Sequence, residues 1–274
     1  MTLASGVWGY SNINNKITMK TIILNILLCL STLSFAGNTE QQVNTWDTYF
    51  VGNIEFINEA PDTKGSEIYA AIIPHPEQYI TAQARKVLET LYFSPEDSIP
   101  GIEKITYVIK DYNGVSAKGG APPHINIVYS TQWVEKSFTD NDTAKVDYET
   151  RGVLYHELTH GYQLEPQGIG TYGTNKTFWA MIEGVADAVR YLNGGFTLED
   201  RPKGGNYMEG YRKAGFFFAW LVQTKDPDFL RKFNRSTLEI IPWSFDGAIK
   251  HVLGEQYNID DLWKEYMVAM GDEN

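Results

Sequence analysis

Cysteine and basic charge are both scarce in this chain of 274 residues. With a single cysteine, Cys29, neither a disulfide within the chain nor a cysteine metal cage can form. Lys and Arg number 23 against 34 Asp and Glu, which gives a formal net charge of −11. This balance argues against binding nucleic acid or an anionic membrane through a general basic field. Internal repeats are also missing, and a hydrophobic content of 43% excludes a disordered chain.

Long apolar runs are absent too, with one exception near the N-terminus. From Met19 the sequence MKTIILNILLCLSTLSFAG places one Lys before an apolar run, with Ser34 and Ala36 at −3 and −1 of a possible cleavage site. The run is too short and too interrupted for a transmembrane helix, and the pattern is typical of a signal peptide. We predict a signal peptide over 1–36, of which 1–18 is a spurious extension if Met19 is the true start. The mature protein is then secreted, periplasmic or extracellular, without a membrane anchor.

The mature chain, residues 37–274, has the pattern of a single α+β domain. The first half predicts a small mixed sheet with one helix, and the second half is helical. The predicted strands cover 51–57, 105–109 and 124–129, and the helix beside them covers 81–92. The later helices are predicted over 148–164, 176–193, 207–224, 227–234, 244–252 and 258–270.

Residues 156–160 read HELTH, an HExxH pattern inside a predicted helix. His156 and His160 are four residues apart on one helix face, so both imidazoles can bind one metal ion. Glu157 stands beside them, where a carboxylate can take a proton from water at the metal. Asp147 is expected to cap the helix at its N-terminus. The alternative is an amphipathic core helix that carries two histidines by chance, so the motif needs a third ligand.

A carboxylate is the favoured third ligand. A metzincin needs Gly and His where this chain has Gln163 and Pro166. In the helical segment WAMIEGVADAVR, Glu183 and Asp187 are four residues apart on one face, and Gly184 would let this helix approach another closely. One carboxylate can bind the metal while the other accepts a ring N–H from a histidine ligand. Two solvated surface acids are the alternative, which the apolar neighbours disfavour.

These motifs resemble those of known peptidases. The HExxH pattern with a downstream ExxxD resembles the gluzincin metallopeptidases, the group containing thermolysin and the zinc aminopeptidases. The segments GVLYHELTHGYQ, IEGVADAVR, GYRKAGFFFAWL and DLWKEYM more closely resemble the basic secretory protein family of plants and bacteria, over about residues 50–270. The resemblance implies a zincin-like fold, a Zn²⁺ cofactor and hydrolysis of peptide or protein substrates.

Carried over position by position, the resemblance implies His156, His160 and Glu183 as zinc ligands and Glu157 as the general base. It also implies that Asp187 is the hydrogen-bond partner of His156. Two features depart from the family pattern. The 22 residues between the second histidine and the glutamate make a longer loop than in thermolysin-like enzymes, and the chain is acidic, unlike the plant members. Contacts from the loop and surface partners therefore do not carry over.

The resemblance further implies a phenol that donates to the oxyanion formed when water attacks a carbonyl. Tyr211 opens YRKAGFFFAWL and resembles the Tyr before a Lys-Gly helix start in zinc aminopeptidases, with a spacing one residue longer. Tyr207 is the second candidate, and simple packing against Phe216 and Trp220 is the structural alternative for either. In gluzincins the edge strand before the active-site helix pairs with the substrate backbone, and the resemblance assigns this role to the strand 124–129.

Three functions of different classes fit these features. The first is a secreted zinc peptidase with Glu157 as general base. The second is a catalytically idle protein of zincin fold that binds peptides or glycoproteins, although a binder has no evident need for Glu157. The third is a structural exported protein with an accidental motif, which the ExxxD helix opposes. Metal content separates the third from the other two, and hydrolysis of an unfolded protein separates the first from the second.

Overall fold

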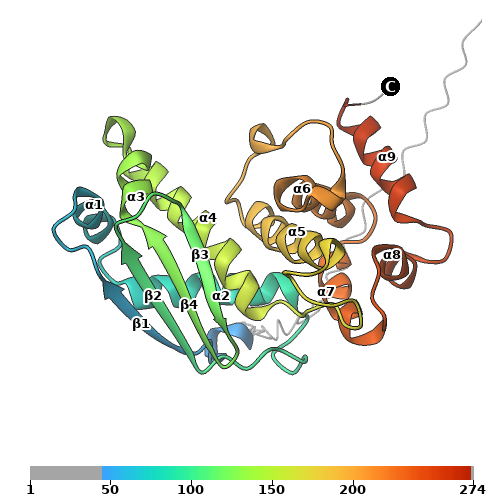
Figure 1. The fold of residues 1–274 in the computed structure, drawn as a ribbon, viewed down its shortest axis with the longest axis horizontal. Coiled ribbons are helices and arrows are strands. Elements are labelled where there is room, and N and C mark those ends of the chain that lie inside the picture. The colour runs from blue at the N-terminus through green and yellow to red at the C-terminus, as the bar shows by residue number, and fades with distance from the viewer. Residues whose placement is uncertain (1–44, 273–274) are drawn as a thin grey trace, which may run out of the picture. The chain divides into compact units, whose positions relative to one another are not determined.

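Four strands from the first half of the chain form one mixed sheet in the computed structural model, which describes residues 45–272 (Figure 1). Their order is β1-β2-β4-β3. The parallel strands are β1 (Asn53–Asn58), β2 (Lys104–Lys110) and β4 (His124–Ser130), and β3 (Ser116–Ala121) runs antiparallel to β4 at one edge. The predicted signal peptide lies outside the described residues.

Helices make up most of the second half of the chain, so the predicted α+β class is confirmed. In the described part of the chain they are α1 (Lys64–Ile72), α2 (Pro76–Leu91), α3 (Thr131–Ser137), α4 (Thr143–Tyr162), α5 (Lys176–Leu192), α6 (Tyr211–Thr224), α7 (Phe229–Glu239), α8 (Phe245–Leu253) and α9 (Ile259–Ala269). Short 3-10 helices lie at Thr45–Thr48, Thr139–Asn141, Leu198–Asp200 and Tyr207–Glu209. None of the described helices has the length and apolar character needed to cross a membrane.

The prediction that the strand 124–129 lies at the sheet edge is wrong. This segment is β4, which pairs with β2 on one side and β3 on the other. The edge strand beside α4 is β3, with the sequence SAKGGA. Small residues without apolar alternation give almost no strand signal, because strand propensity reflects side chains that pack on a pleated surface. The edge strand β3 could therefore not be predicted from the sequence.

The N-terminal boundary of α4 also differs from its prediction. The helix begins at Thr143, and its cap is Asp142, whose side chain accepts a hydrogen bond from Lys145 N–H at 3.0 Å. The predicted cap, Asp147, lies within the helix and instead accepts a hydrogen bond from the Tyr79 hydroxyl at 2.6 Å. The helix is therefore tied to α2 about one turn beyond its cap.

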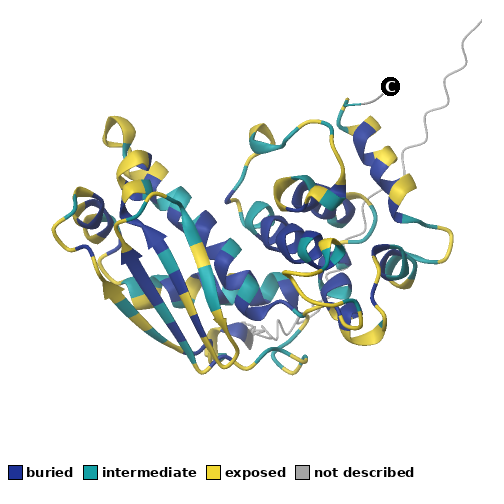
Figure 2. Cartoon of the chain, viewed as in Figure 1, coloured by how far each residue is buried: buried dark blue, intermediate teal, exposed yellow. Residues whose placement is uncertain are grey.

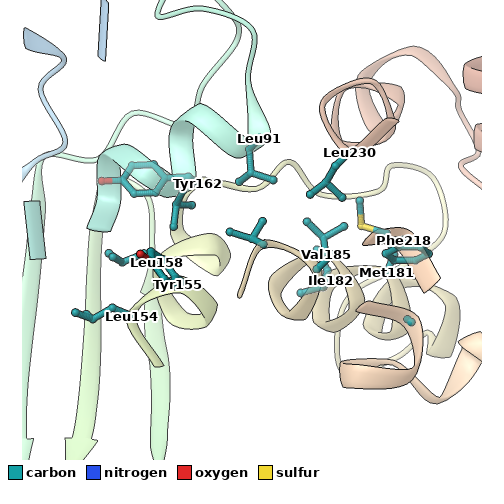
Figure 3. Close-up of a cluster of buried hydrophobic side chains, with 14 of the residues drawn as sticks. Leu91, Leu154, Tyr155, Leu158, Tyr162, Met181, Ile182, Val185, Phe218 and Leu230 are labelled. Atoms are coloured by element: carbon teal, nitrogen blue, oxygen red, sulfur yellow. The ribbon is translucent and has the colours of Figure 1, made fainter. Parts of the chain in front are cut away.

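The helix α4 lies between the sheet and the later helices and is buried along most of its length (Figure 2). Its apolar side chains, including Leu154 and Leu158 on the side of the sheet, belong to the same buried cluster as Leu91 of α2 and Ile182 and Val185 of α5 (Figure 3). Phe218 of α6 and Leu230 of α7 extend the same cluster. Burial of this kind contributes about 1.5–3 kcal/mol per large apolar side chain, so it holds α4 and α5 in a fixed relation.

Two glycines allow α5 and α6 to approach closely, as the sequence predicted for Gly184. A Cβ atom on Gly184 would lie 2.6 Å from the Cβ of Ala214, and one on Gly215 would lie 2.7 Å from the Cβ of Asp187. Larger residues at either position would push the helices apart. This contact holds α6 close beside Asp187 of α5.

Candidate metal centre

The three predicted metal ligands come together from two helices. His156 and His160 project from the same face of α4, with their Nε2 atoms 3.1 Å apart. Glu183 projects from α5, and its Oε2 lies 3.3 Å from His156 Nε2 and 3.6 Å from His160 Nε2. One ligand atom from each residue lies within 4.8 Å of the other two. A carboxylate and two imidazoles thus converge on one point.

The Glu183 carboxylate shows that this convergence fits a metal ion. Its Oε1 accepts a hydrogen bond from the Tyr172 hydroxyl at 2.5 Å, whereas its Oε2 is buried and has no hydrogen bond among the described residues. A buried unpaired carboxylate oxygen is unfavourable unless a charge or a metal compensates it. Two imidazole nitrogens and one carboxylate oxygen are also the protein donors of many catalytic zinc sites.

The histidines and carboxylates are strongly coupled. His156 Nδ1 lies 2.7 Å from Asp187 Oδ1, as the resemblance implied. Burial of the His156 ring would lower its pKa, but the hydrogen bond to Asp187 and the nearby carboxylate of Glu183 outweigh burial and raise that pKa to about 10. Burial would raise the pKa of Glu183, but the imidazoles of His156 and His160 beside its Oε2 hold that pKa well below its usual value. Without metal, the His156 ring therefore holds its proton beside the ionised carboxylate of Glu183.

Glu157 lies beside the ligands and is itself buried, with 5% of its surface exposed. Its Oε1 accepts a hydrogen bond from the Ser116 hydroxyl of β3 at 2.6 Å. Glu157 and the three ligands line one cavity of about 390 Å³. The edge strand β3 contributes Ser116, Ala117 and Lys118 to the cavity wall. The carboxylate thus stands between the ligands and the edge strand.

The two phenol candidates occupy different environments. Tyr211 begins α6, lines the cavity and stacks on the His156 ring, with centroids 6.1 Å apart and planes 12° apart. It has φ of +43° directly after Gly210, and such left-handed backbone in a non-glycine residue is concentrated at functional sites. Tyr207 is buried in the aromatic core beside Trp263, and its hydroxyl donates to Asp260 at 2.9 Å.

Sequence reasoning missed three polar side chains of the cavity. Tyr172 lies in the Gly- and Thr-rich stretch 165–174, for which the sequence pattern predicts only a connection between two helices. Ser116 belongs to the strand that gave no signal. Gln163, which contacts His160, was used only to exclude a metzincin. The one indication in the sequence was that Tyr172 and Gln163 both lie in the segment between His160 and Glu183.

Comparison with protein-family models matches residues 52–266 to the BSP family, described as a peptidase of plants and bacteria. This range includes all the residues of the candidate metal centre and agrees with the resemblance to the basic secretory protein family. Comparison with curated proteins and with solved structures found no match. Because the family model matches most of the chain, this protein belongs to the BSP family of peptidases of plants and bacteria.

Proposed function

We propose that this protein is a secreted zinc-dependent peptidase that hydrolyses peptide bonds with Glu157 as general base. The observation that carries the proposal is the convergence of His156, His160 and Glu183 beside this buried carboxylate in one cavity. A structural protein with an accidental motif would have no reason to place two buried carboxylates beside two largely covered imidazoles, because burying charged groups is unfavourable unless they are paired or bind a metal.

The chain's own residues would hold the metal through two imidazole nitrogens and Glu183 Oε2. Asp187 orients His156 through its Nδ1, and the Tyr172 hydroxyl donates a hydrogen bond to Oε1, the other oxygen of Glu183. A Zn²⁺ ion bound there supplies Lewis acidity, which polarises a peptide carbonyl and makes water reactive near neutral pH.

The proton transfers are assigned to Glu157. Ser116 holds its Oε1, so Oε2 is the oxygen that takes the proton from the attacking water. The same carboxyl group then gives the proton to the nitrogen of the leaving amine. Tyr211, at the opposite wall of the cavity, donates its hydroxyl hydrogen bond to the oxyanion that develops on the carbonyl.

The substrate is an extended peptide that pairs with β3. This strand is hydrogen-bonded to β4 on one side only, lies at the sheet edge and forms part of the cavity wall. An extended chain added along such an edge gains affinity from main-chain hydrogen bonds, largely independent of sequence. The role that the sequence assigned to 124–129 is therefore transferred to 116–121.

The decisive experiment compares the zinc-loaded mature protein with its Glu157→Gln variant on an unfolded protein substrate. We expect the variant to keep zinc and fold but to lose about 10²–10⁴-fold in turnover, the usual contribution of a general acid–base group. Cleavage products of a denatured proteome, compared between the two proteins, then define the substrate preference. Equal turnover would contradict the mechanism. A zinc-loaded wild type that binds unfolded protein without cleaving it would support the idle, peptide-binding alternative.

A further inference from the structure

The residue that follows α4 turns its side chain back toward His160. Gln163 has an extended backbone, with φ of −68° and ψ of 148°, and its N–H donates to the carbonyl of Thr159 at 2.7 Å. Its side-chain Nε2 lies 2.7 Å from His160 Nδ1. The opposite ring nitrogen, Nε2, is the one that faces His156 and Glu183. Gln163 therefore contacts His160 on the side away from the metal centre.

The amide orientation in the metal-free structure leaves one atom without a partner. An amide nitrogen can only donate, so His160 Nδ1 must accept, and the ring proton then resides on Nε2. Meanwhile Gln163 Oε1 is buried and has no hydrogen bond among the described residues, in a residue that is only 5% exposed. A buried amide oxygen that lacks a partner, next to a ring nitrogen, points to a second arrangement.

A half-turn of the amide exchanges its oxygen and nitrogen without moving the rest of the side chain. Gln163 Oε1 then accepts a hydrogen bond from Nδ1–H of His160, so the ring proton moves from His160 Nε2 to Nδ1 and His160 Nε2 directs a lone pair at the centre. Histidine ligands of metals nearly always donate their other ring N–H to a carboxylate, a carbonyl or water, which fixes the tautomer. His156 already has this kind of partner in Asp187, at 2.7 Å.

We propose that Gln163 is a positioning residue whose side-chain oxygen holds His160 in the tautomer that presents Nε2 to a divalent metal. The inference rests on the metal site of the proposed function, but it does not depend on peptide hydrolysis. The two histidines are then oriented by different groups, His156 by a carboxylate and His160 by a neutral amide.

Three variants of the mature protein test this role through zinc affinity, measured by competition with a chelator. Gln163→Leu removes the acceptor and keeps the approximate size, and it should weaken zinc binding by about 10–100-fold. Gln163→Glu retains an acceptor oxygen and should stay near the wild-type affinity. Gln167→Leu, on the exposed stretch that follows, is the matched control and should leave affinity unchanged.

A second measurement reports the tautomer directly. Nitrogen-15 NMR of the zinc-loaded wild type should show the His160 proton on Nδ1, and it decides the question alone if Gln163→Leu fails to fold. Wild-type zinc affinity in a folded Gln163→Leu protein, or a proton on Nε2 in the loaded wild type, would overturn the inference and leave the peptidase proposal intact. A zinc-loaded wild type without hydrolytic activity would overturn the peptidase proposal and leave the role of Gln163 standing.

Discussion

The two walls of the cavity are built in different ways. The sheet-side wall comes from α4 and β3, and the helix-side wall comes from α5, the stretch before it and the start of α6. The sheet-side wall includes Ser116, His156, Glu157 and His160, and the helix-side wall includes Tyr172, Glu183 and Tyr211. Asp187, on the same helix as Glu183, supports the helix-side wall through its contact with His156 but does not line the cavity.

The histidines of the sheet-side wall depend only on the period of one helix. Any α-helix places residues four apart on one face, so HELTH is sufficient to align His156 with His160. The helix-side wall depends on packing between distant segments. Asp187 reaches His156 across the contact between α5 and α4, and Gly215 of α6 leaves room for Asp187, since a Cβ atom on Gly215 would lie 2.7 Å from the Cβ of Asp187. Local geometry thus supplies the two imidazoles, and tertiary packing supplies the carboxylates.

The largest effect is expected when one ligand is removed from either wall. We predict that His156→Ala, from the sheet-side wall, and Glu183→Ala, from the helix-side wall, each abolish stoichiometric zinc binding, because a catalytic zinc needs all three protein ligands. Elemental analysis of the purified variants measures this loss. Glu165→Ala is the matched control, since Glu165 lines the cavity but is not among the three ligands, and it should keep one zinc per chain. If either ligand variant retained wild-type zinc, the ligand set would be wrong.

The same division explains what the sequence could and could not predict. The fold class and the convergence of the three candidate ligands could be predicted from helical period and from the resemblance, because Glu183 and Asp187 lie on one face of a strongly apolar helix. Ser116 was missed because its strand has small residues and no apolar alternation, so its place at the sheet edge depends on pairing with β4. Tyr172 was missed because a phenol in an irregular segment has no periodic neighbours that would indicate its direction.

Tyr207 and Tyr211 show the limit of such reasoning most clearly. The sequence could only rank them, because they are four residues apart in the same segment. A single glycine between them, Gly210 with φ of +62°, separates the 3-10 turn that holds Tyr207 from the helix that begins at Tyr211. The backbone conformation at Gly210 places the Tyr207 ring in the core and leaves the Tyr211 ring at the cavity.

The next largest effect should come from the phenol of the helix-side wall. If the Tyr211 hydroxyl donates to the developing oxyanion, Tyr211→Phe should lower kcat by about 10²–10³-fold, or roughly 3–4 kcal/mol, with KM nearly unchanged. The fold should be little affected, because the ring that stacks on His156 and packs against Trp179 is retained. Steady-state kinetics on a peptide substrate measure both constants.

Two other tyrosines act as controls for this assignment. Tyr207→Phe removes the hydrogen bond to Asp260 and should reduce stability by about 1 kcal/mol without affecting kcat. If Tyr207→Phe instead impaired kcat and Tyr211→Phe did not, the assignment of the donor would be wrong. Tyr172→Phe removes the hydroxyl that donates to Glu183. A loss of kcat in this variant alone would assign the oxyanion role to Tyr172.

A smaller effect is expected where the two walls meet, at the hydrogen bond between His156 and Asp187. Asp187→Asn keeps the size of the side chain but replaces a charged acceptor with a neutral amide. We expect zinc affinity to fall by about 10–100-fold, the usual result of altering such a partner. Asp260→Asn, which changes an exposed carboxylate that accepts a hydrogen bond from the Tyr207 hydroxyl, should leave the affinity unchanged. Equal affinities in the two variants would show that Asp187 does not orient the ligand.

The smallest effect concerns the proton that this pair holds before metal binds. The hydrogen bond to Asp187 and the nearby carboxylate of Glu183 overcome the effect of burial and raise the pKa of His156 to about 10, so the ring is charged at pH 7.5 in the metal-free protein. Glu183 adds no proton, because its pKa is lowered. Zinc must therefore displace a proton from His156, and its apparent affinity should rise about tenfold per pH unit near neutral pH. Calorimetry at pH 7.5 in buffers of different ionisation enthalpy should detect the release of at least one proton. Asp187→Asn should reduce that release by lowering the pKa of His156. Zinc binding without proton release would show that Asp187 and Glu183 do not control the charge of His156.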